Sequence, residues 1–432
     1  MTIADRQPRI PMTDGFTPVR RAVVIGAGTM GSGIAAHLAN CGIVVALLDR
    51  VADGDDRSAL ARTAIERQVQ VGGFMVPAFA ARVTPGNVED DLDVVAEADW
   101  IVEAVFEDPN VKHELYAKLE GLRRPGTLMS SNTSGIPVAE LVRGHSEEFA
   151  RDFTITHFFN PPRTMELLEV VAGSDTSPEV LERTIRVADS QLGKTVLECR
   201  DTPGFIANRL GSHWMAVAAL EAFEAGLDVE TADAIMSRPF GIPRTGVFGL
   251  FDLVGVNLVP LLWPVLTRAL PADDAAQRYD LMGDRVFQHL LDNGLIGRRG
   301  PGGFTRRKNE AGEKVDEVID LESLEYRARR QVTDPAGSAG DIAAVLAGDS
   351  DGSRYAWTVF AQVLDYACHI APEVGDDVAA VDAGMELGYA WARGPFKLAD
   401  AVGAAQLLAR YEAEGRAVPG LLAAAAKAGG FY

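Results

Sequence analysis

The chain has 432 residues, of which 47% are hydrophobic and 24% are charged. This composition is typical of a globular protein, and the length is sufficient for two or three domains. The 41 basic and 61 acidic residues give a formal net charge of −20, which excludes long-range attraction to nucleic acid or to anionic membrane surfaces.

No apolar run approaches the roughly 20 residues of a membrane-spanning helix, so no membrane span is expected. The three cysteines, Cys41, Cys199 and Cys368, are far apart and odd in number, which indicates neither a disulfide framework nor a thiolate metal site. Residues 1–20 contain acids and prolines and no apolar core, so we expect an irregular leader and not a signal peptide. A reducing, cytoplasmic compartment fits these features best.

The first predicted elements follow one another in a strict order. Residues 22–25 read as a buried β-branched strand, residues 26–31 (GAGTMG) as a glycine turn, and residues 32–40 as a helix. Residues 43–48 read as a second buried strand, which ends at Asp49. A strand, glycine turn, helix, strand and acid in this order are the fingerprint of a dinucleotide-binding unit.

Each part of this fingerprint has a physical role. Gly26 makes the tight turn, Gly28 lets backbone N–H groups approach a pyrophosphate, and Gly31 lets the helix pack closely on the strand, while the helix N-terminus favours the anion. Asp49 is placed to accept a hydrogen bond from a ribose hydroxyl, which favours NAD over NADP, although Arg50 beside it leaves NADP open. A GxGxxG motif alone could also be a flexible turn, but the flanking elements favour the cofactor.

Further buried strands alternate with helical stretches and predict a doubly wound α/β sheet of the Rossmann type. Ligands bind such a sheet at the carboxyl ends of its strands. The further strands are predicted at residues 100–105, 127–131, 153–159 and 195–199.

Polar residues follow these strands where a ligand would bind. Glu107, Asn132, Ser134, His157 and Asn160 all lie at the ends of predicted strands, so we expect them to gather at the same edge of the sheet. Taken singly, each has a plainer interpretation, such as a solvated acid, a helix cap or a packed histidine. Together they indicate a site.

His157 has a candidate partner further along the chain. Two prolines break its strand, and residues 167–171 read as a return strand that carries Glu169. A carboxylate on a neighbouring strand could fix the imidazole tautomer and stabilise an imidazolium, as a general base requires. The alternative is a packed histidine and a solvated edge-strand glutamate.

These motifs together resemble the L-3-hydroxyacyl-CoA dehydrogenase family. Its signature runs HFFNP, a glutamate twelve residues after the histidine, and DTPGFxxNR; the chain has HFFNP from His157, then Glu169, and DTPGFIANR at residues 201–209. GAGTMG, EAVFED and SSNTS also stand where the family has them, and the resemblance runs from Arg21 to about Val402. It implies NAD-dependent oxidation of L-3-hydroxyacyl-CoA to 3-ketoacyl-CoA in fatty-acid β-oxidation.

The resemblance assigns roles to individual residues. His157 becomes the catalytic base, Glu169 its orienting acid, Ser134 a substrate contact and Asn208 the active-site asparagine. Asn160 becomes a supporting hydrogen-bonding residue beside the histidine. Glu107 and Lys112 match residues that line the nicotinamide and its ribose. The expected cofactor-binding set is Gly26, Gly28, Thr29, Met30, Gly31, Asp49, Glu107, Lys112, Asn132 and Asn160.

The sequence does not assign the residues that contact the CoA moiety or the acyl chain of the substrate. The stretch after the second strand shares no motif with the family, so Arg57, Arg62 and Arg67 are candidates for CoA contacts only by charge. The side chains that could either line the acyl chain or belong to the core are Met165, Phe205, Trp214 and Met215.

The second half of the chain contains a repeat. The pattern GxFxxxDxxG occurs at residues 246–255 and again at 394–403, each time after a helical region that ends in glycine, which predicts a duplicated all-α domain. The resemblance is then greatest to multifunctional fatty-acid oxidation proteins, in which two such domains pack as an internal pseudo-dimer. The second copy lacks the GFIANR asparagine, so we expect it to be scaffold.

The expected organisation has five parts. They are a leader (1–20), a Rossmann-type NAD-binding domain (21–200), a first helical domain (201–305), a partly ordered connector (306–351) and a second helical domain (352–432). Residues 298–304 (RRGPGGF) read as a turn or a phosphate cradle. The tandem arrangement implies an enoyl-CoA hydratase domain or partner, and either a monomer with an internal pseudo-dimer or a homodimer.

Two other functions remain open on the sequence. The protein could oxidise a free hydroxy acid within the same fold, or it could be a scaffold module that binds NAD without turnover. The set of His157, Glu169, Ser134 and Asn208 favours an enzyme over a module. No metal ligands are assigned, because the seven histidines show no ligand spacing.

Overall fold

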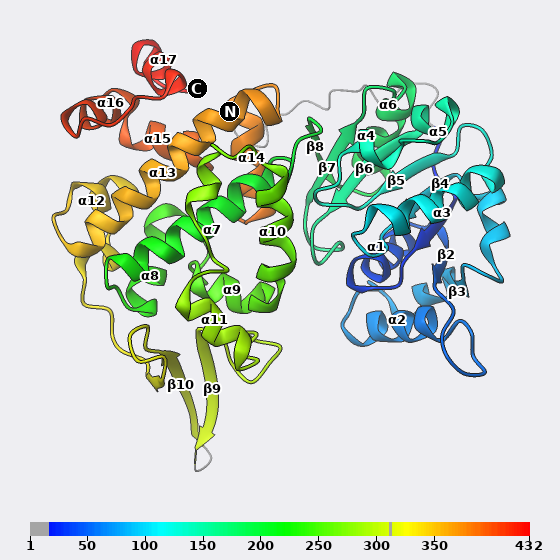
Figure 1. The fold of residues 1–432 in the computed structure, drawn as a ribbon, viewed down its shortest axis with the longest axis horizontal. Coiled ribbons are helices and arrows are strands. Elements are labelled where there is room, and N and C mark those ends of the chain that lie inside the picture. The colour runs from blue at the N-terminus through cyan, green and yellow to red at the C-terminus, as the bar shows by residue number, and fades with distance from the viewer. Residues whose placement is uncertain (1–16, 311–312) are drawn as a thin grey trace. The chain divides into compact units, whose positions relative to one another are not determined.

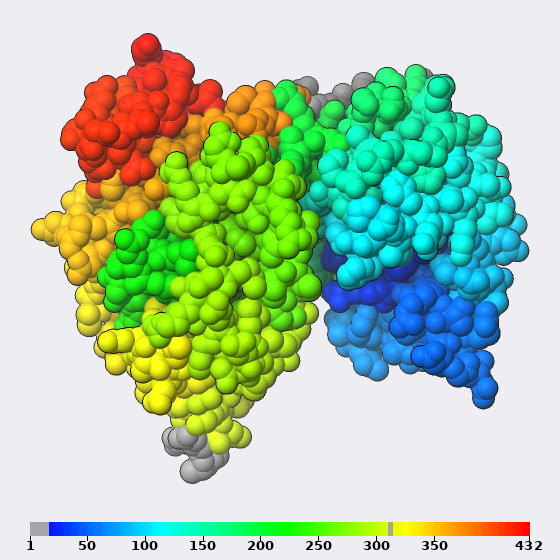
Figure 2. Space-filling model, in the orientation of Figure 1, coloured from blue at the N-terminus to red at the C-terminus, as the bar shows by residue number. Residues whose placement is uncertain are grey.

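The computed structural model describes residues 17–310 and 313–432 (Figure 1). They form two units, one that ends at Phe205 and one that spans Ile206–Tyr432, and each has a core of buried apolar side chains. Figure 2 shows the outer surface, with all atoms drawn, of the face seen in Figure 1. Of the leader predicted for residues 1–20, residues 1–16 lie outside the described part of the chain, and the first strand begins at Arg21.

The first unit contains a mainly parallel sheet, as the sequence predicted. Among the described residues its strands have the order β3-β2-β1-β4-β5-β6-β7-β8, and only the β6–β7 pair is antiparallel. The chain order reverses beside β1, which is the topology of a doubly wound nucleotide-binding sheet. The strands are β1 (Arg21–Ile25), β2 (Val44–Asp49), β3 (Val83–Asn87), β4 (Trp100–Glu103), β5 (Leu128–Ser131), β6 (Phe153–Phe158), β7 (Leu167–Ala172) and β8 (Thr195–Cys199).

Strand β3 was not predicted, because its sequence VTPGN contains a proline and a glycine. It lies at the edge of the sheet and pairs with β2 alone. An edge strand tolerates Pro85, since a residue without an N–H group costs no hydrogen bond on the solvent side. Local composition therefore concealed a strand that the neighbouring β2 stabilises.

Helices cover both faces of this sheet (Figure 1). Apolar residues of α1, α2 and α6 share one core with alternate residues of the strands, whereas Tyr116 of α3 and Phe149 of α5 pack on Phe153 at the opposite face. The helices of this unit are α1 (Thr29–Asn40), α2 (Ala59–Gln70), α3 (Pro109–Leu122), α4 (Val138–Leu141), α5 (Glu147–Arg151) and α6 (Pro178–Arg186), with short η2 (Pro77–Arg82), η3 (Leu92–Glu97) and η4 (Val187–Gln191).

The second unit is mainly helical, and its helices follow the predicted repeat. The first copy contains α7 (Ala207–Glu224), α8 (Val229–Ile235), η5 (Arg238–Phe240), α9 (Phe248–Val254), η6 (Val256–Leu258), α10 (Val259–Ala269), η7 (Ala275–Arg278) and α11 (Arg285–Asp292). The second copy contains α13 (Asp351–Val374), α14 (Val378–Gly388), α15 (Pro395–Val402), α16 (Ala404–Ala413) and α17 (Gly420–Ala428).

A buried aspartate organises each copy in the same way. Asp233 accepts hydrogen bonds from the backbone N–H of Phe248 (2.7 Å) and of the next residue (3.1 Å). Asp382 does the same with Phe396 (2.8 Å) and the next residue (3.0 Å). Burial raises the pKa of Asp233 to about 8 and that of Asp382 to about 6. The duplication is therefore present in the hydrogen bonds as well as in the sequence.

A second aspartate of the repeat binds the backbone near the C-terminal end of each copy. Asp252 accepts from the N–H of Phe304 (2.7 Å), and Asp400 accepts from the N–H of Phe431 (2.8 Å). Both phenylalanines follow a Gly-Gly pair, and an added Cβ at Gly303 would lie only 2.0 Å from Asp252 Oδ1. The glycine-rich segment at 298–304 is thus folded onto Asp252, and GGF was the signal that would have extended the repeat.

The prediction of a partly ordered connector at 306–351 was wrong for the described residues. They contain an antiparallel sheet of order β11-β10-β9, in which opposite charges face each other at Arg306–Glu317 and Arg307–Asp316, both 2.6 Å apart. The strands were not predicted because their sequences are rich in charged residues. The elements are β9 (Thr305–Glu310), β10 (Glu313–Ile319), β11 (Tyr326–Ala328), η8 (Pro335–Ser338) and α12 (Ile342–Ala347).

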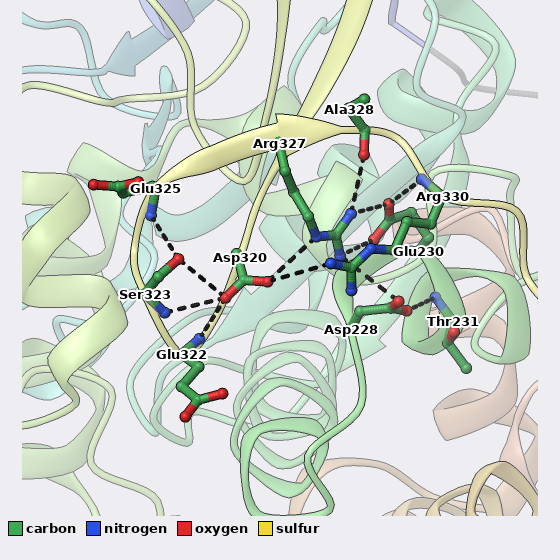
Figure 3. Close-up of polar contacts among 10 residues, drawn as sticks. All are labelled: Asp228, Glu230, Thr231, Asp320, Glu322, Ser323, Glu325, Arg327, Ala328 and Arg330. Carbon is green, nitrogen blue, oxygen red and sulfur yellow. Dashed lines mark hydrogen bonds and ion pairs between the residues drawn. The ribbon is translucent and has the colours of Figure 1, made fainter.

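Arg327 of β11 attaches this small sheet to α8 (Figure 3). Its guanidinium donates to both carboxylate oxygens of the buried Glu230, at 2.7 and 3.0 Å. It also lies 3.3 Å from Asp320 and 3.6 Å from Asp228. A bidentate pair of this kind fixes orientation as well as distance, so the sheet is an integral part of the second unit.

The helices of the described residues differ from a membrane span in length or polarity. No single helix among them is long and apolar enough to cross a membrane. Only α9 taken together with residues 256–269 has the length and composition, and this pair bends by 75°.

A buried histidine makes the stability of the second unit depend on pH. His213 is 1% exposed, packs on Tyr366 at 4.0 Å between ring centroids, and makes no hydrogen bond of ordinary geometry through its ring nitrogens within the described residues. Burial lowers its pKa from 6.5 to about 3, against the opposing effects of Asp274 and the Gln362 backbone.

Replacing His213 with phenylalanine is expected to remove the contribution of this histidine to the pH dependence. The unfolded chain takes up the histidine proton below pH 6.5 and the folded chain does not, so stability is complete above that pH and is lost as the pH falls. Between pH 7 and pH 5 the contribution of His213 to this loss should reach about 2 kcal/mol, measured as the difference between the wild type and His213→Phe, because the raised pKa values of Asp233 and Asp382 act in the opposite sense in both proteins. Urea unfolding at both pH values measures it, and an equal loss in His213→Phe would contradict this explanation.

Candidate active site

The glycine turn between β1 and α1 is shaped by close packing at two positions and by open space at the third. Gly26 has a φ of +104°, and an added Cβ would lie 2.4 Å from the carbonyl oxygen of Ala104. An added Cβ at Gly31 would lie 1.8 Å from the carbonyl oxygen of Gly26, whereas one at Gly28 would meet nothing within 4 Å. The fold itself requires Gly26 and Gly31, and the space at Gly28 fits the approach of a ligand.

The N-terminus of α1 suits an anion. The helix begins at Thr29, and its N-cap, Gly28, offers no side chain to the first backbone N–H groups. The first turn contains no acid. Thr29 is exposed and Met30 is half-buried against the core. Uncapped N–H groups at a helix N-terminus bind phosphate oxygens readily, so these residues fit a dinucleotide pyrophosphate.

Asp49 lies beside this turn, as predicted, at the last position of β2. Its Oδ2 atom accepts from the backbone N–H of Ala27 (2.5 Å), and its Oδ1 atom accepts from that of Arg50 (2.7 Å). The carboxylate is therefore fixed next to the glycine turn, where a ribose hydroxyl could donate to it.

The buried acid Glu103, at the end of β4, is a feature that sequence reasoning missed. It is fully buried and accepts hydrogen bonds from Lys112 Nζ (2.7 Å), the Tyr116 hydroxyl (2.6 Å) and the Ser131 hydroxyl (2.7 Å). These donors come from α3 and β5, so only the tertiary fold brings them together. The available signal was the acid inside the apolar strand WIVEAV, because a buried carboxylate needs partners.

Lys112 connects this buried acid to the candidate site. It is 1% exposed, and its ammonium also lies 3.2 Å from Glu107. Glu107 in turn accepts from the hydroxyl of Thr133 and from the backbone N–H of Ser134 (3.2 Å). The structure therefore brings Glu107 and Ser134 together at the ends of β4 and β5, as their positions predicted. Lys112 of α3, named only through the resemblance, contacts Glu107, and Thr133 is an addition that was not predicted.

Asn132 connects the end of β5 to β6. Its side-chain oxygen accepts from the backbone N–H of Phe158 (2.9 Å), the residue directly after His157. Asn160 is exposed and precedes Pro161 through a cis peptide bond. Both residues thus lie close in sequence or space to the histidine.

His157 and Glu169 form a buried pair across β6 and β7. They are directly opposed in the antiparallel register, and His157 Nδ1 lies 2.7 Å from Glu169 Oε2. The side chains are 6% and 0% exposed, and the ring centroid of Phe159 lies 4.7 Å from that of the imidazole. A carboxylate at Nδ1 fixes that nitrogen as the donor of the neutral ring. The return strand was predicted from the sequence, and the contact was one of the two alternatives that the sequence left open.

Lys194 holds residues 159–166, the segment between β6 and β7. It is a second residue that sequence reasoning missed. Its buried ammonium donates to the carbonyl oxygens of Pro162 and Met165 (2.6 Å to the latter). Burial lowers the pKa of Lys194 to about 8. Pro162 also packs on α1, because an added Cβ at Gly33 would lie 2.9 Å from its ring. The segment between β6 and β7 therefore also contacts α1, the helix that follows the glycine turn.

Other predicted residues lie elsewhere. Asn208 is in the first turn of α7, in the second unit, whereas the rest of the predicted catalytic and cofactor set is in the first unit. Arg57 and Arg62 are exposed and pair with Asp90 (2.6 Å) and Asp56 (2.9 Å). Of the candidate acyl-lining residues, Phe205 and Trp214 are buried core side chains, and Met165 and Met215 are half-buried.

Two family models match the chain. Residues 21–202 match the NAD-binding domain of 3-hydroxyacyl-CoA dehydrogenase, and residues 204–307 match the C-terminal domain of 3-hydroxyacyl-CoA dehydrogenase. The match thus covers both the glycine turn with the His157–Glu169 pair and the first helical copy with Asn208.

Similar proteins carry related names. The chain is 37% identical over 383 residues, which are 88% of it, to a Rickettsia felis protein named "Putative fatty acid oxidation complex trifunctional enzyme", and it spans about half (53%) of that relative. It is 35% identical to a Deinococcus radiodurans protein named "Probable 3-hydroxyacyl-CoA dehydrogenase", over 68% of this chain and 84% of the relative.

The fold has a solved counterpart. The structure of 3-hydroxybutyryl-CoA dehydrogenase from Escherichia coli superposes with a TM-score of 0.69 at 22% identity, and the match covers 96% of this chain and 99% of that one. Because the two family models match residues 21–202 and 204–307 and the Deinococcus relative is 35% identical over 84% of its length, the chain belongs to the 3-hydroxyacyl-CoA dehydrogenase family of NAD-dependent oxidoreductases.

Proposed function

We propose that the protein interconverts L-3-hydroxyacyl-CoA and 3-ketoacyl-CoA with NAD, as a step of fatty-acid β-oxidation. The observation that carries the proposal is the buried His157–Glu169 pair, in the same unit as the glycine turn of the NAD-binding domain. A histidine oriented by a buried carboxylate is a general base or acid suited to a hydroxyl group.

The proton is handled by His157. Glu169 holds Nδ1, so the proton of the 3-hydroxyl group is accepted at Nε2. The negative charge of Glu169 stabilises the imidazolium that forms, and burial strengthens this interaction because water does not screen it. NAD supplies the acceptor for the hydride that leaves C3. In the reverse direction His157 returns its proton to the oxygen of the 3-keto group.

Binding falls to the residues around the pair. Gly26, Gly28, Thr29, Met30 and Gly31 hold the pyrophosphate, and the carboxylate of Asp49 accepts from the adenosine ribose. Glu107 and Lys112 line the nicotinamide and its ribose, with Asn132 and Asn160 beside them, while Ser134 and Asn208 hold the hydroxyl or thioester oxygens.

The organisation proposed with this function keeps the predicted boundaries. Residues 21–200 form the NAD-binding domain, and residues 201–305 and 352–432 form two helical domains that pack as an internal pseudo-dimer. The name of the Rickettsia relative supports an enoyl-CoA hydratase domain or partner. The protein acts in the cytoplasm, as a monomer or as a homodimer.

The oxidation of NADH by acetoacetyl-CoA tests the substrate class. Absorbance should fall rapidly with acetoacetyl-CoA and with a long-chain 3-ketoacyl-CoA, and the faster of the two reports the preferred chain length. Free acetoacetate at the same concentration should react at least 100-fold more slowly, because it lacks the binding energy of the CoA moiety. Equal rates with acetoacetate would favour a free-acid dehydrogenase, and NADH binding without turnover would favour a scaffold module.

A further inference from the structure

The second helical copy has no counterpart of Asn208. Counted back from Asp382 as Asn208 is from Asp233, the corresponding residue is Trp357. Its indole N–H donates to Glu414 (2.8 Å), and the guanidinium of Arg410 lies 3.8 Å from the ring centroid. Trp357 is therefore a packing residue, and the second copy supplies no second active-site asparagine at this position.

The second copy instead contacts Arg209, the residue next to Asn208. Arg209 is 3% exposed, and its guanidinium has three partners: Asp274 (2.8 Å), the hydroxyl of Tyr366 (3.0 Å) and Glu373 (3.2 Å). Asp274 belongs to the first copy, but Tyr366 and Glu373 are on α13 of the second. A planar guanidinium with partners in fixed directions has little freedom to rotate.

The second copy also packs on the backbone around the asparagine. An added Cβ at Gly384, in α14, would lie 2.7 Å from the side chain of Ile206 and 3.5 Å from the Cα atom of Ala207. On the other side, an added Cβ at Gly211 of α7 would lie 2.0 Å from the ring of Tyr389. Elements of the second copy therefore contact the start of α7 both before and after Asn208.

We propose that Tyr366 and Glu373 are positioning residues for the reaction: they hold Arg209, and through it they set the direction in which the adjacent Asn208 presents its amide to the substrate. The second helical copy is then a working part of the active site. This inference rests on the proposed role of Asn208. Displacements of less than 1 Å at such a residue are enough to change turnover strongly.

Tyr366→Phe tests the inference against a matched control, Tyr355→Phe. Both tyrosines are buried on α13, and the Tyr355 hydroxyl donates to the carbonyl oxygen of Ala218 (2.7 Å) in α7 without contacting Arg209. The two variants should lose similar stability. Tyr366→Phe should lower kcat/KM for acetoacetyl-CoA by roughly 10- to 100-fold and raise its KM, with the Kd for NADH unchanged, whereas Tyr355→Phe should match the wild type.

A purely structural role would give a different result. It would lower the fraction of active enzyme and leave KM for acetoacetyl-CoA unchanged, and equal KM values in Tyr366→Phe and Tyr355→Phe would overturn the inference. If Tyr366→Phe does not fold, Glu373→Gln decides, because Glu373 is 42% exposed and its replacement should be tolerated; its KM should rise by about threefold, and an unchanged KM overturns the inference. A wild type that reduces no 3-ketoacyl-CoA would remove the proposed function, and this inference with it.

Discussion

Replacing His157 with glutamine is expected to lower kcat for the reduction of acetoacetyl-CoA by about 100- to 10 000-fold, the usual contribution of a general acid or base. Glutamine still offers a hydrogen-bond donor to the buried Glu169, so the fold should persist. The Kd for NADH should not change, because His157 handles the proton and not the cofactor. Steady-state kinetics and a fluorescence titration with NADH measure the two quantities.

The matched control is His145→Gln. His145 is half-buried, lies in the first unit as His157 does, and also lies against a carboxylate, with its Nδ1 atom 2.9 Å from Glu120, but no part of the proposed reaction uses it. Its kcat should stay within about twofold of the wild type. A His157→Gln variant that also keeps wild-type kcat would remove the assignment of the base.

Replacing Gly31 with alanine is the second change with a large expected effect. The new Cβ would lie 1.8 Å from the carbonyl oxygen of Gly26, so α1 and the glycine turn must move apart. Overpacking of this kind costs roughly 1–3 kcal/mol; a loss of this size in cofactor affinity is about a 10- to 100-fold higher Kd for NADH. The melting temperature of the free protein should fall as well.

Gly28→Ala separates the role of the fold from the role of the cofactor. Its Cβ would meet no protein atom within 4 Å, so the free protein should melt at the wild-type temperature. The methyl group would nevertheless occupy the space in which the pyrophosphate approaches the backbone, and NADH binding should weaken. Wild-type affinity in both variants would contradict the proposed pyrophosphate site.

The sequence was informative wherever a local pattern reflects a long-range contact. The order of β1, the glycine turn, α1, β2 and Asp49 predicted the dinucleotide-binding part of the first unit. The antiparallel return from His157 to Glu169 could be predicted because two prolines end one strand and an apolar run begins the next. The alternative of a packed histidine beside a solvated glutamate fails, since Glu169 is fully buried against the imidazole.

Features without such a pattern were missed. Glu103 and Lys194 are buried charged groups whose partners come from distant segments, so their hydrogen bonds cannot be recognised in the sequence around them, although the apolar strand around Glu103 indicates its burial. The small sheet at residues 305–328 was concealed because its strands pair by charge, and β3 because it contains Pro85. In each case tertiary contacts outweighed local composition.

The most direct test of the central claim is the oxidation of NADH by acetoacetyl-CoA, followed by absorbance in parallel for the wild type and Glu169→Gln. The claim is that a buried carboxylate makes His157 an effective acid and base. Fast oxidation by the wild type and a loss of about 100-fold or more in Glu169→Gln, at unchanged affinity for NADH, is the predicted result. Equal rates for the two proteins would contradict it, because the buried pair would then have no part in the chemistry.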